Sequence, residues 1–281
     1  MRIELATEPG DPQRPNEDYA SVALPASGQG GALVLLDGVT PPAEDYGCRH
    51  TVPWFTARLG GAMLELSVSL RDMTLAEVLD AAISRTAAAH RATCDLSHVR
   101  TPQATVVAAR WSTETVEYLV LSDSVLLLER ADGSVHPVLD PRLDHLPPAV
   151  QERRAAVRAL PRGSAERAAA AREYGRAVEA LRNAEGGFFT AAADPAVAAR
   201  AVTGSLPRSG IRSLTALTDG AARWVEVFRE GSWADCVGLV AAQGPQSLID
   251  RVRAAEAADP EATAHPRGKG RDDAAVIFVV P

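Results

Sequence analysis

The segment 31–40 reads Gly-Ala-Leu-Val-Leu-Leu-Asp-Gly-Val-Thr. Its apolar run begins at Ala32 and stops at the dipeptide Asp37-Gly38. A short, uninterrupted apolar run that ends at a turn dipeptide is typical of a strand buried on both faces. Asp37 would then stand where a rigid strand passes into a loop, a suitable place to hold a metal ion or a substrate. Because Asp-Gly is also a common turn pair, the functional interpretation depends on recurrence of the pattern.

The same combination of a strand-like run and an acidic group occurs at five places in the chain. The acidic groups are Glu17-Asp18, Asp37, Asp123, Asp219 and Asp272-Asp273. A hard divalent cation is held by several carboxylate oxygens, and a set of oxygen ligands favours Mg²⁺ or Mn²⁺ over Zn²⁺. We therefore expect the fold to gather these groups into one metal site, with no competing cluster of His or Cys.

Composition indicates a globular protein and excludes some partners. The chain has 281 residues, 46% hydrophobic and 23% charged, enough for a large core in one large or two small domains. The net charge of −7 argues against a nucleic-acid partner. The N-terminus lacks an apolar signal region, and no apolar stretch approaches the roughly 18 residues of a membrane span. Cys48, Cys94 and Cys236 are far apart without metal-ligand spacing, so we expect reduced thiols and a cytoplasmic location.

Periodicity predicts blocks of strands and blocks of helices. Strands are expected over 2–6, 19–24, 32–36, 104–110, 115–122, 124–130, 134–138, 186–190, 211–218 and 274–280. Helices are expected over 51–70, 74–93, 151–160, 165–182, 221–228, 233–242 and 245–258. Thr74 and Glu77 have the spacing of a capping box. Helices grouped in blocks, rather than alternating with strands, indicate an α+β fold.

Five segments in order resemble the motifs of the metal-dependent protein phosphatases of the 2C type. These are Asn16-Glu17-Asp18, Leu36-Asp37-Gly38, Leu121-Ser122-Asp123-Ser124, Leu217-Thr218-Asp219-Gly220 and Asp272-Asp273-Ala274-Ala275-Val276. The resemblance covers about residues 3–280 and suggests a divergent, bacterial-like member. It implies a four-layer α-β-β-α sandwich of two mainly antiparallel sheets flanked by helices. We expect a single domain over 1–281 with a helical insertion at about 147–183.

The resemblance also implies roles for the acidic residues. Asp37 would bridge two metal ions, Gly38 would contribute its carbonyl oxygen, and Asp219 and Asp272 would complete the first ion. These aspartates would act in catalysis through metal-bound water, because paired cations activate water and clamp phosphoryl oxygens.

The remaining acidic residues would serve further ions. Glu17 would hold the second ion, with Asp18 acting directly or through a water. Asp123, together with Asp219, would hold a third, weaker ion. Asp273 would orient the groups around Asp272.

The sequence departs from the family pattern at two places. Many members follow the second motif with a turn that contains a His, whereas Val39-Thr40-Pro41-Pro42 stands here, so the general acid is unassigned. His50 could fold back, although a capped or exposed histidine is the more ordinary interpretation. The family's phosphate-contacting Arg usually stands four residues before the equivalent of Glu17. Arg14 stands three before it, and a phosphate contact and a solvated loop arginine remain equally open.

Some other polar residues have ordinary interpretations. The Thr105 hydroxyl is expected to serve packing. Arg267, Lys269 and Arg271 either screen the last acidic pair, steer phosphate or are simply solvated.

Three functional hypotheses follow. The first is a Mg²⁺- or Mn²⁺-dependent hydrolase of phosphomonoesters, specifically a protein serine/threonine phosphatase that uses two ions and a third weaker one. The alternative is a catalytically weakened, phosphatase-like binding or regulatory domain. A third is a hydrolase of small phosphate metabolites. The expected partner is a phosphoprotein or another phosphomonoester, without nucleic acid or membrane, and the oligomeric state is left open.

Overall fold

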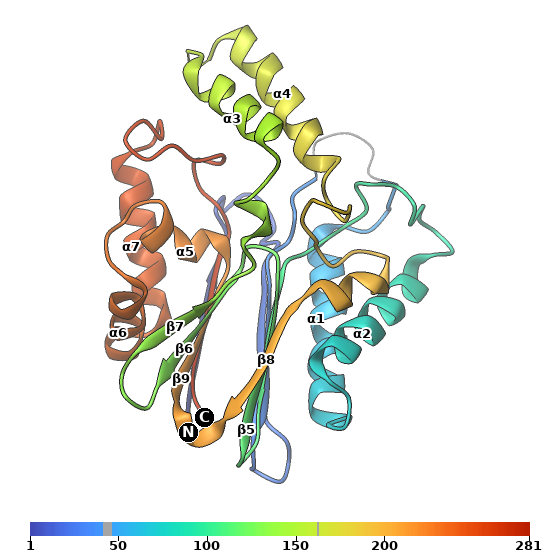
Figure 1. Cartoon of the computed structure of the whole chain (residues 1–281), viewed down its shortest axis with the longest axis vertical. Helices are drawn as coiled ribbons and strands as arrows, with labels where there is room; N and C mark the ends of the chain where they lie inside the picture. Colours follow the sequence, from blue (N-terminus) through green and yellow to red (C-terminus); the bar gives the residue numbers. More distant parts are fainter. Residues whose placement is uncertain (42–46, 162) are drawn as a thin grey trace.

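The computed structural model describes residues 1–41, 47–161 and 163–281, and its core is a pair of facing sheets (Figure 1). The first sheet has the strand order β1-β10-β9-β6-β7 and the second β2-β3-β4-β5-β8. The first comprises β1 (Arg2–Glu8), β10 (Ala274–Val280), β9 (Ile211–Leu217), β6 (Val125–Arg130) and β7 (Val135–Val138). The second comprises β2 (Tyr19–Ala23), β3 (Gly31–Leu36), β4 (Val106–Trp111), β5 (Thr115–Leu121) and β8 (Val202–Pro207). All of their neighbouring strands pair antiparallel.

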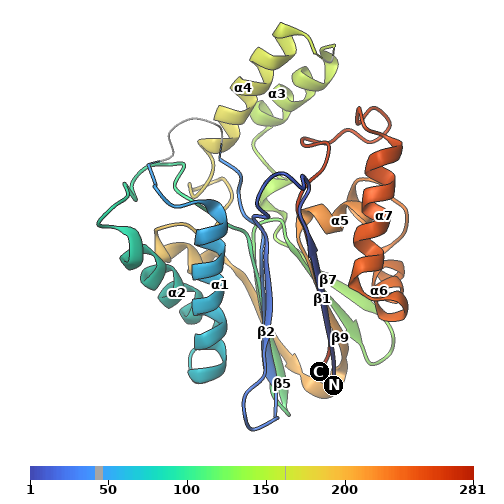
Figure 2. The same ribbon diagram turned by 180° about the vertical axis from the view of Figure 1, so that it is seen from behind.

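Helices cover the outer face of each sheet (Figures 1 and 2). The second sheet is covered by α1 (Val52–Ser69) and α2 (Leu75–His90). The first is covered by α5 (Asp219–Glu226), α6 (Trp233–Gln243) and α7 (Pro245–Ala258). Three apolar clusters fill the interfaces: one under each helical layer and one between the sheets. The predicted α+β, four-layer α-β-β-α sandwich is confirmed. None of the helices in the described part of the chain is long and apolar enough to cross a membrane.

The burial of β3 explains its continuous apolar sequence. Every residue of this strand is buried. Leu33 and Leu35 pack between the sheets, whereas Val34 and Leu36 face the layer of α1 and α2. Since successive side chains of a strand point to opposite faces, a strand covered on both sides needs apolar residues at every position. Asp37 is therefore held by a strand that is packed on both faces.

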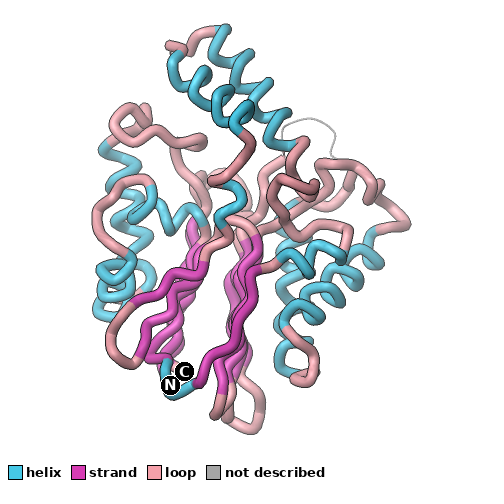
Figure 3. Tube along the Cα trace, in the orientation of Figure 1, coloured by secondary structure: helices cyan, strands magenta, loops and turns pink. Residues whose placement is uncertain are grey.

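Two helices project from the sandwich beyond the layers (Figure 3). They are α3 (Pro148–Ala159) and α4 (Ala165–Glu179), and they confirm the helical character expected near 147–183. Of the side chains described in these helices, only Val150 is buried, and the small cluster at their base includes Leu146 and Phe188. Their many charges lie mostly on exposed faces, as expected.

Two predictions of strand positions were wrong. The segment 186–190 is not a strand, because Phe188 makes only an isolated bridge to Arg182, and the next bridge, from Ala191 to Ala104, is isolated as well. The strand β8 was not foreseen. It is an edge strand with alternating half-buried and exposed residues, and it contains Gly204 and Pro207, which are uncommon in strands. The other strands and the helices were confirmed within a few residues of their ends.

Candidate functional site: an acidic centre at the end of the sandwich

Strand register brings the N-terminal acidic residues next to Asp37. In the pair β2–β3, Tyr19 stands opposite Leu36. Asp18 comes directly before Tyr19, and Asp37 comes directly after Leu36. The two aspartates therefore leave the same end of the second sheet as neighbours.

The first sheet brings three more aspartates to this end of the molecule. Leu217 of β9 stands opposite Val276 of β10 and Val125 of β6. The aspartates that flank these strands on that side are Asp123, Asp219 and Asp272. Thr218 fixes the β9–β10 junction, because its hydroxyl accepts the N–H of Ala275 at 2.8 Å and its own N–H donates to the Ala275 carbonyl at 3.1 Å.

Two adjoining cavities lie among these residues. The larger has a volume of about 460 Å³ and the smaller of about 210 Å³. The larger is lined by Asp37, Gly38, Asp123, Asp219 and Asp272, with Arg182 on its wall. The smaller is lined by Arg14, Glu17, Asp272 and Asp273. Thr40, Lys269 and Asp272 border both, so the two cavities form one acidic centre.

The carboxylates of the acidic centre disturb one another's ionisation. Burial raises the pKa of Asp37 well above its ordinary value, and the charges of Asp219, Asp18 and Asp123 raise it further. Burial and then Asp219 raise the pKa of Asp123 to about 7. Like charges held together in a partly dry site favour a bound proton or a bound cation.

Asp18 is a buried carboxylate without a counter-ion in the described part of the chain. Both of its carboxylate oxygens are buried and have no hydrogen-bond partner among the described residues. Burial, followed by the charge of Asp273, raises its pKa well above the ordinary value, and the neighbouring Thr218 hydroxyl offsets only part of this rise. A buried carboxylate without hydrogen bonds is costly unless something compensates it.

Asp272 is already paired with two cationic side chains. Its Oδ1 accepts from Lys269 Nζ at 2.7 Å, and its Oδ2 accepts from Arg223 at 2.8 Å. Arg223 also donates to the buried Glu256 at 2.8 Å. Burial alone would lower the pKa of Lys269, but Asp272 and Asp37 raise it. Of the roles open to Lys269, screening of the acidic centre is therefore the one observed.

Asp273 orders the N-terminal segment. Its carboxylate accepts the N–H of Gly10 at 2.8 Å and the N–H of Glu17 at 2.6 Å. As expected, it also contacts Asp272, because its backbone N–H donates to Asp272 Oδ1 at 3.2 Å, while its carboxylate fixes the loop that carries Glu17. The Glu17 side chain accepts a hydrogen bond from the Thr40 hydroxyl, and burial raises its pKa.

Thr105 positions Asp37, a role that packing arguments missed. The Thr105 hydroxyl accepts the Asp37 N–H at 3.3 Å, and the Thr105 N–H donates to the Asp37 carbonyl at 2.9 Å. The same hydroxyl contacts the Ser124 hydroxyl, next to Asp123. Thr105 and Ser124 are both buried, so they connect the bases of two aspartates across the sheets.

Glycine is required where acidic segments approach other chain segments most closely. A Cβ at Gly220 would lie 1.9 Å from the Asp273 carbonyl oxygen. A Cβ at Gly38 would lie 2.5 Å from the Glu17 carbonyl oxygen and 2.5 Å from Val52 Cγ1. The Asp-Gly pairs therefore permit close packing of the acidic segments in addition to a turn.

Two arginines reach the acidic centre from different sides. Arg14 is exposed on the rim of the smaller cavity. Arg182, which follows α4, lines the larger cavity, where its Nε is buried without a hydrogen-bond partner among the described residues. Burial lowers its pKa. Arg182 was missed because its sequence context is an Ala- and Arg-rich helix, where most charges are solvated.

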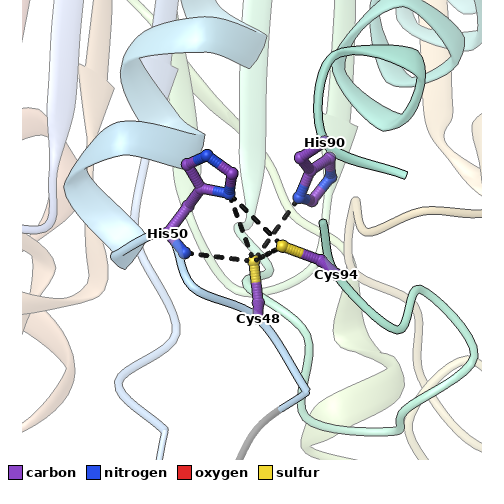
Figure 4. A group of neighbouring side chains, drawn as sticks. All are labelled: Cys48, His50, His90 and Cys94. Atoms are coloured by element: carbon purple, nitrogen blue, oxygen red, sulfur yellow. Dashed lines mark hydrogen bonds between the residues drawn. The ribbon is translucent and has the colours of Figure 1, made fainter. Parts of the chain in front are cut away.

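His50 does not line either cavity, so folding back towards the acidic residues is not observed. It contacts Cys48 and Cys94 instead, and His90 joins them (Figure 4). The expectation that the cysteines lie apart and that no His/Cys cluster exists was wrong for this group. The signal in the sequence was a Cys-x-His pair and a His-x-x-x-Cys pair.

Comparisons of sequence and of structure gave different results. No protein-family model and no curated protein sequence matches the chain. The serine/threonine phosphatase PstP/Ppp of Mycobacterium tuberculosis is 17% identical, with a TM-score of 0.54 over 99% of this chain and 97% of that chain. A structure of the PstP catalytic domain with two manganese ions is 16% identical, with a TM-score of 0.54 over 99% and 96%. The S. agalactiae serine/threonine phosphatase is 15% identical, with a TM-score of 0.57 over 100% and 99%. The chain therefore has the fold of these bacterial serine/threonine phosphatases.

Proposed function

We propose that the chain is a Mg²⁺- or Mn²⁺-dependent phosphomonoester hydrolase of the 2C type, and specifically a protein serine/threonine phosphatase. We also propose that residues 1–281 form a single domain, with the helices near 147–183 as an insertion. The observation that carries the functional proposal is the state of Asp18. Its two buried, unpartnered oxygens lie among carboxylates with raised pKa values, and such a set is suited to divalent cations.

The proposed ligands in the acidic centre fit these ions, because every one of them offers oxygen. In the proposed assignment, Asp37, the Gly38 carbonyl, Asp219 and Asp272 hold the first ion. Glu17 and Asp18 complete the second, and Asp123 with Asp219 holds a weaker third. When bound, the paired ions supply Lewis acidity and an activated water for attack on phosphorus.

The other groups of the chain orient the ligands and receive the substrate. Thr105 holds the backbone of Asp37, and Asp273 holds the segment of Glu17. Two cationic side chains, Arg14 and Arg182, are candidates for phosphate oxygens, because a guanidinium can donate two parallel hydrogen bonds to them. The unpartnered Nε of Arg182 favours Arg182 for this task.

The alternative, a weakened domain that binds or regulates, has a specific observation in its favour. Both oxygens of Asp272 are taken by Lys269 and Arg223, which would have to yield before Asp272 could bind an ion. A hydrolase of small phosphate metabolites would use the same acidic centre and differ only in its substrate.

The decisive experiment compares hydrolysis of p-nitrophenyl phosphate with Mn²⁺, with Mg²⁺ and with chelator. We expect metal-dependent turnover by the wild-type protein and its loss in Asp37→Asn. The matched control is Asp132→Asn in the hairpin between β6 and β7, which should keep full activity. Substantial turnover by Asp37→Asn with Mn²⁺ present would contradict the assignment. No metal-dependent turnover by the wild type would favour the regulatory alternative.

A panel of phosphoserine and phosphothreonine peptides then distinguishes the two enzymatic hypotheses. Protein phosphatase activity predicts kcat/KM values for peptides well above those for small phosphate esters. The reverse order would favour a metabolite as the substrate.

A further inference from the structure

Four metal-ligating side chains lie together between the start of α1 and the end of α2 (Figure 4). Cys48 and His50 stand in the segment directly before α1, His90 is the last residue of α2, and Cys94 follows it. Their ligand atoms all lie within 4.8 Å of one another. None of the four lines the cavities of the acidic centre. We propose that this Cys/His cluster is a structural zinc site, independent of the proposed phosphatase activity.

The ligand set is the one that zinc prefers. Two cysteine sulfurs and two imidazole nitrogens make a Cys₂His₂ site, which is typical of closed, tetrahedral structural zinc. Nδ1 of His50 lies 3.3 Å from Cys94 Sγ, and Nδ1 of His90 lies 3.4 Å from Cys48 Sγ. The two sulfurs are 3.0 Å apart and belong to free cysteines. Both rings thus present a nitrogen to the pair of sulfurs.

The backbone around the Cys/His cluster supports thiolates. The Arg49 N–H donates to Cys94 Sγ at 3.3 Å, and the His50 N–H donates to Cys48 Sγ at 3.4 Å. The Cys94 N–H donates to the His90 carbonyl at 3.0 Å, so these two ligands are one turn apart after α2. Hydrogen bonds of this kind fix the orientation of metal ligands and stabilise their charge.

His90 is a buried imidazole whose Nδ1 faces a cysteine sulfur. The residue is only 2% exposed, and its Nε2 has no hydrogen-bond partner in the described part of the chain. Trp54 encloses the two rings, with its ring centroid 3.9 Å from that of His50 and 5.2 Å from that of His90. A metal bound at Nδ1, the nitrogen 3.4 Å from Cys48 Sγ, would give this buried ring one strong partner and would offset part of the cost of burying it, although Nε2 would stay unpaired among the described residues.

The proposed zinc would fasten the two helices of one layer together. Cys48 and Cys94 are 46 residues apart in the chain, so the metal would close a long loop that contains both α1 and α2. The first residue of α1, Val52, packs closely against Gly38 of the acidic centre. The zinc would therefore brace the helix end that supports the loop after β3.

The test separates the Cys/His cluster from the acidic centre, which could also bind zinc. Asp37→Asn serves as the background, and the protein is reduced and stripped of metal with a chelator. Co²⁺ is then added as a probe. We expect the intense visible bands of tetrahedral cobalt and a thiolate-to-cobalt charge-transfer band. After addition of Zn²⁺ and removal of excess metal, mass spectrometry should find about one zinc per chain.

Matched variants assign the ligands. Cys48→Ser and Cys94→Ser should lose the charge-transfer band or weaken it strongly, whereas Cys236→Ala, a cysteine buried under the other sheet, should keep it. Zinc should raise the Tm of the stripped Asp37→Asn protein but not that of the variant that also carries Cys48→Ser. A stripped and reduced protein that shows no thiolate band with Co²⁺ would overturn the proposal. So would a band that persists in both serine variants. Neither outcome bears on Mn²⁺-dependent activity.

Discussion

Replacement of Asp123 by Asn tests whether the acidic centre is held together against electrostatic repulsion. Burial and the charge of Asp219 raise the pKa of Asp123 from the ordinary 3.8 to about 7. When folding raises the pKa of a carboxyl, the free energy of unfolding is unaffected at pH values below the pKa of the unfolded chain. It falls as the pH rises from 3.8 towards 7, because the folded protein resists losing the proton, and is then constant. The metal-free wild-type protein should therefore lose stability over this range, and Asn should remove that loss while keeping the side-chain shape.

The size of the effect follows from the shift. A rise of about three pKa units lowers the free energy of unfolding by at most about 4 kcal/mol at pH 8, and Asp123→Asn would recover this amount. Asp123 is half-buried, so we expect screening to reduce the gain to about 2 kcal/mol. At pH 5 the upper limit falls to about 1.6 kcal/mol, and the gain should shrink in proportion.

The assay is urea unfolding in the presence of EDTA at pH 8 and pH 5. The matched control is Asp132→Asn, since hydrogen bonds from Ser134 lower the pKa of Asp132 and its loss should cost stability. If Asp123→Asn is no more stable than the wild type at pH 8, or gains more at pH 5 than at pH 8, the carboxylates do not repel one another as inferred.

Three further predictions concern the ions, the substrate and the backbone. Mn²⁺ should raise the Tm more at pH 8 than at pH 6, because protons compete with the ion for carboxylates such as Asp37, whose pKa is raised. Equal increases in Tm at the two pH values would contradict this. Arg182→Ala should lower kcat/KM for phosphopeptides by about 10-fold or more, because one charge-assisted hydrogen bond to the phosphate is lost. The loss should exceed that of Arg14→Ala in steady-state kinetics, and the opposite order would assign the phosphate contact to Arg14. Gly220→Ala should destabilise the protein by about 2 kcal/mol or more, because its Cβ would overlap the Asp273 carbonyl; urea unfolding that matches the wild type would show that the segment can move without penalty.

Much of the fold could be predicted because most of its strands and helices have clear hydrophobic periodicity and terminal signals in their own sequence. The apolar run 32–36 became a strand covered on both faces, and Thr74 with Glu77 became a capping box at the start of α2. The acidic residues could be predicted as a group because each one flanks a strand, and strand ends that share register meet at one edge of a sandwich. Their individual roles as metal ligands remain predictions.

The rest depended on contacts between distant segments. The Cys/His cluster joins two short pairs that lie about forty residues apart, and it exists only because α1 and α2 pack side by side. Lys269 was one of three basic residues with similar surroundings in the sequence, and only the packed loop shows that it bonds both Asp272, three residues on, and the distant Thr40. The edge strand β8 has weak propensity of its own, and its pairing with β5 determines its conformation.

The pairing of β1 with β10 bears on the order in which the protein assembles during synthesis. Arg2 lies opposite Val280, and the two ends of the chain meet in the same sheet (Figure 2). During synthesis, β1 must therefore wait until β10 has emerged before it finds its neighbour. Asp272 and Asp273, which stand before β10, join the other acidic residues only then, so the full crowding of negative charge is postponed until β10 has paired, when a bound cation can neutralise it.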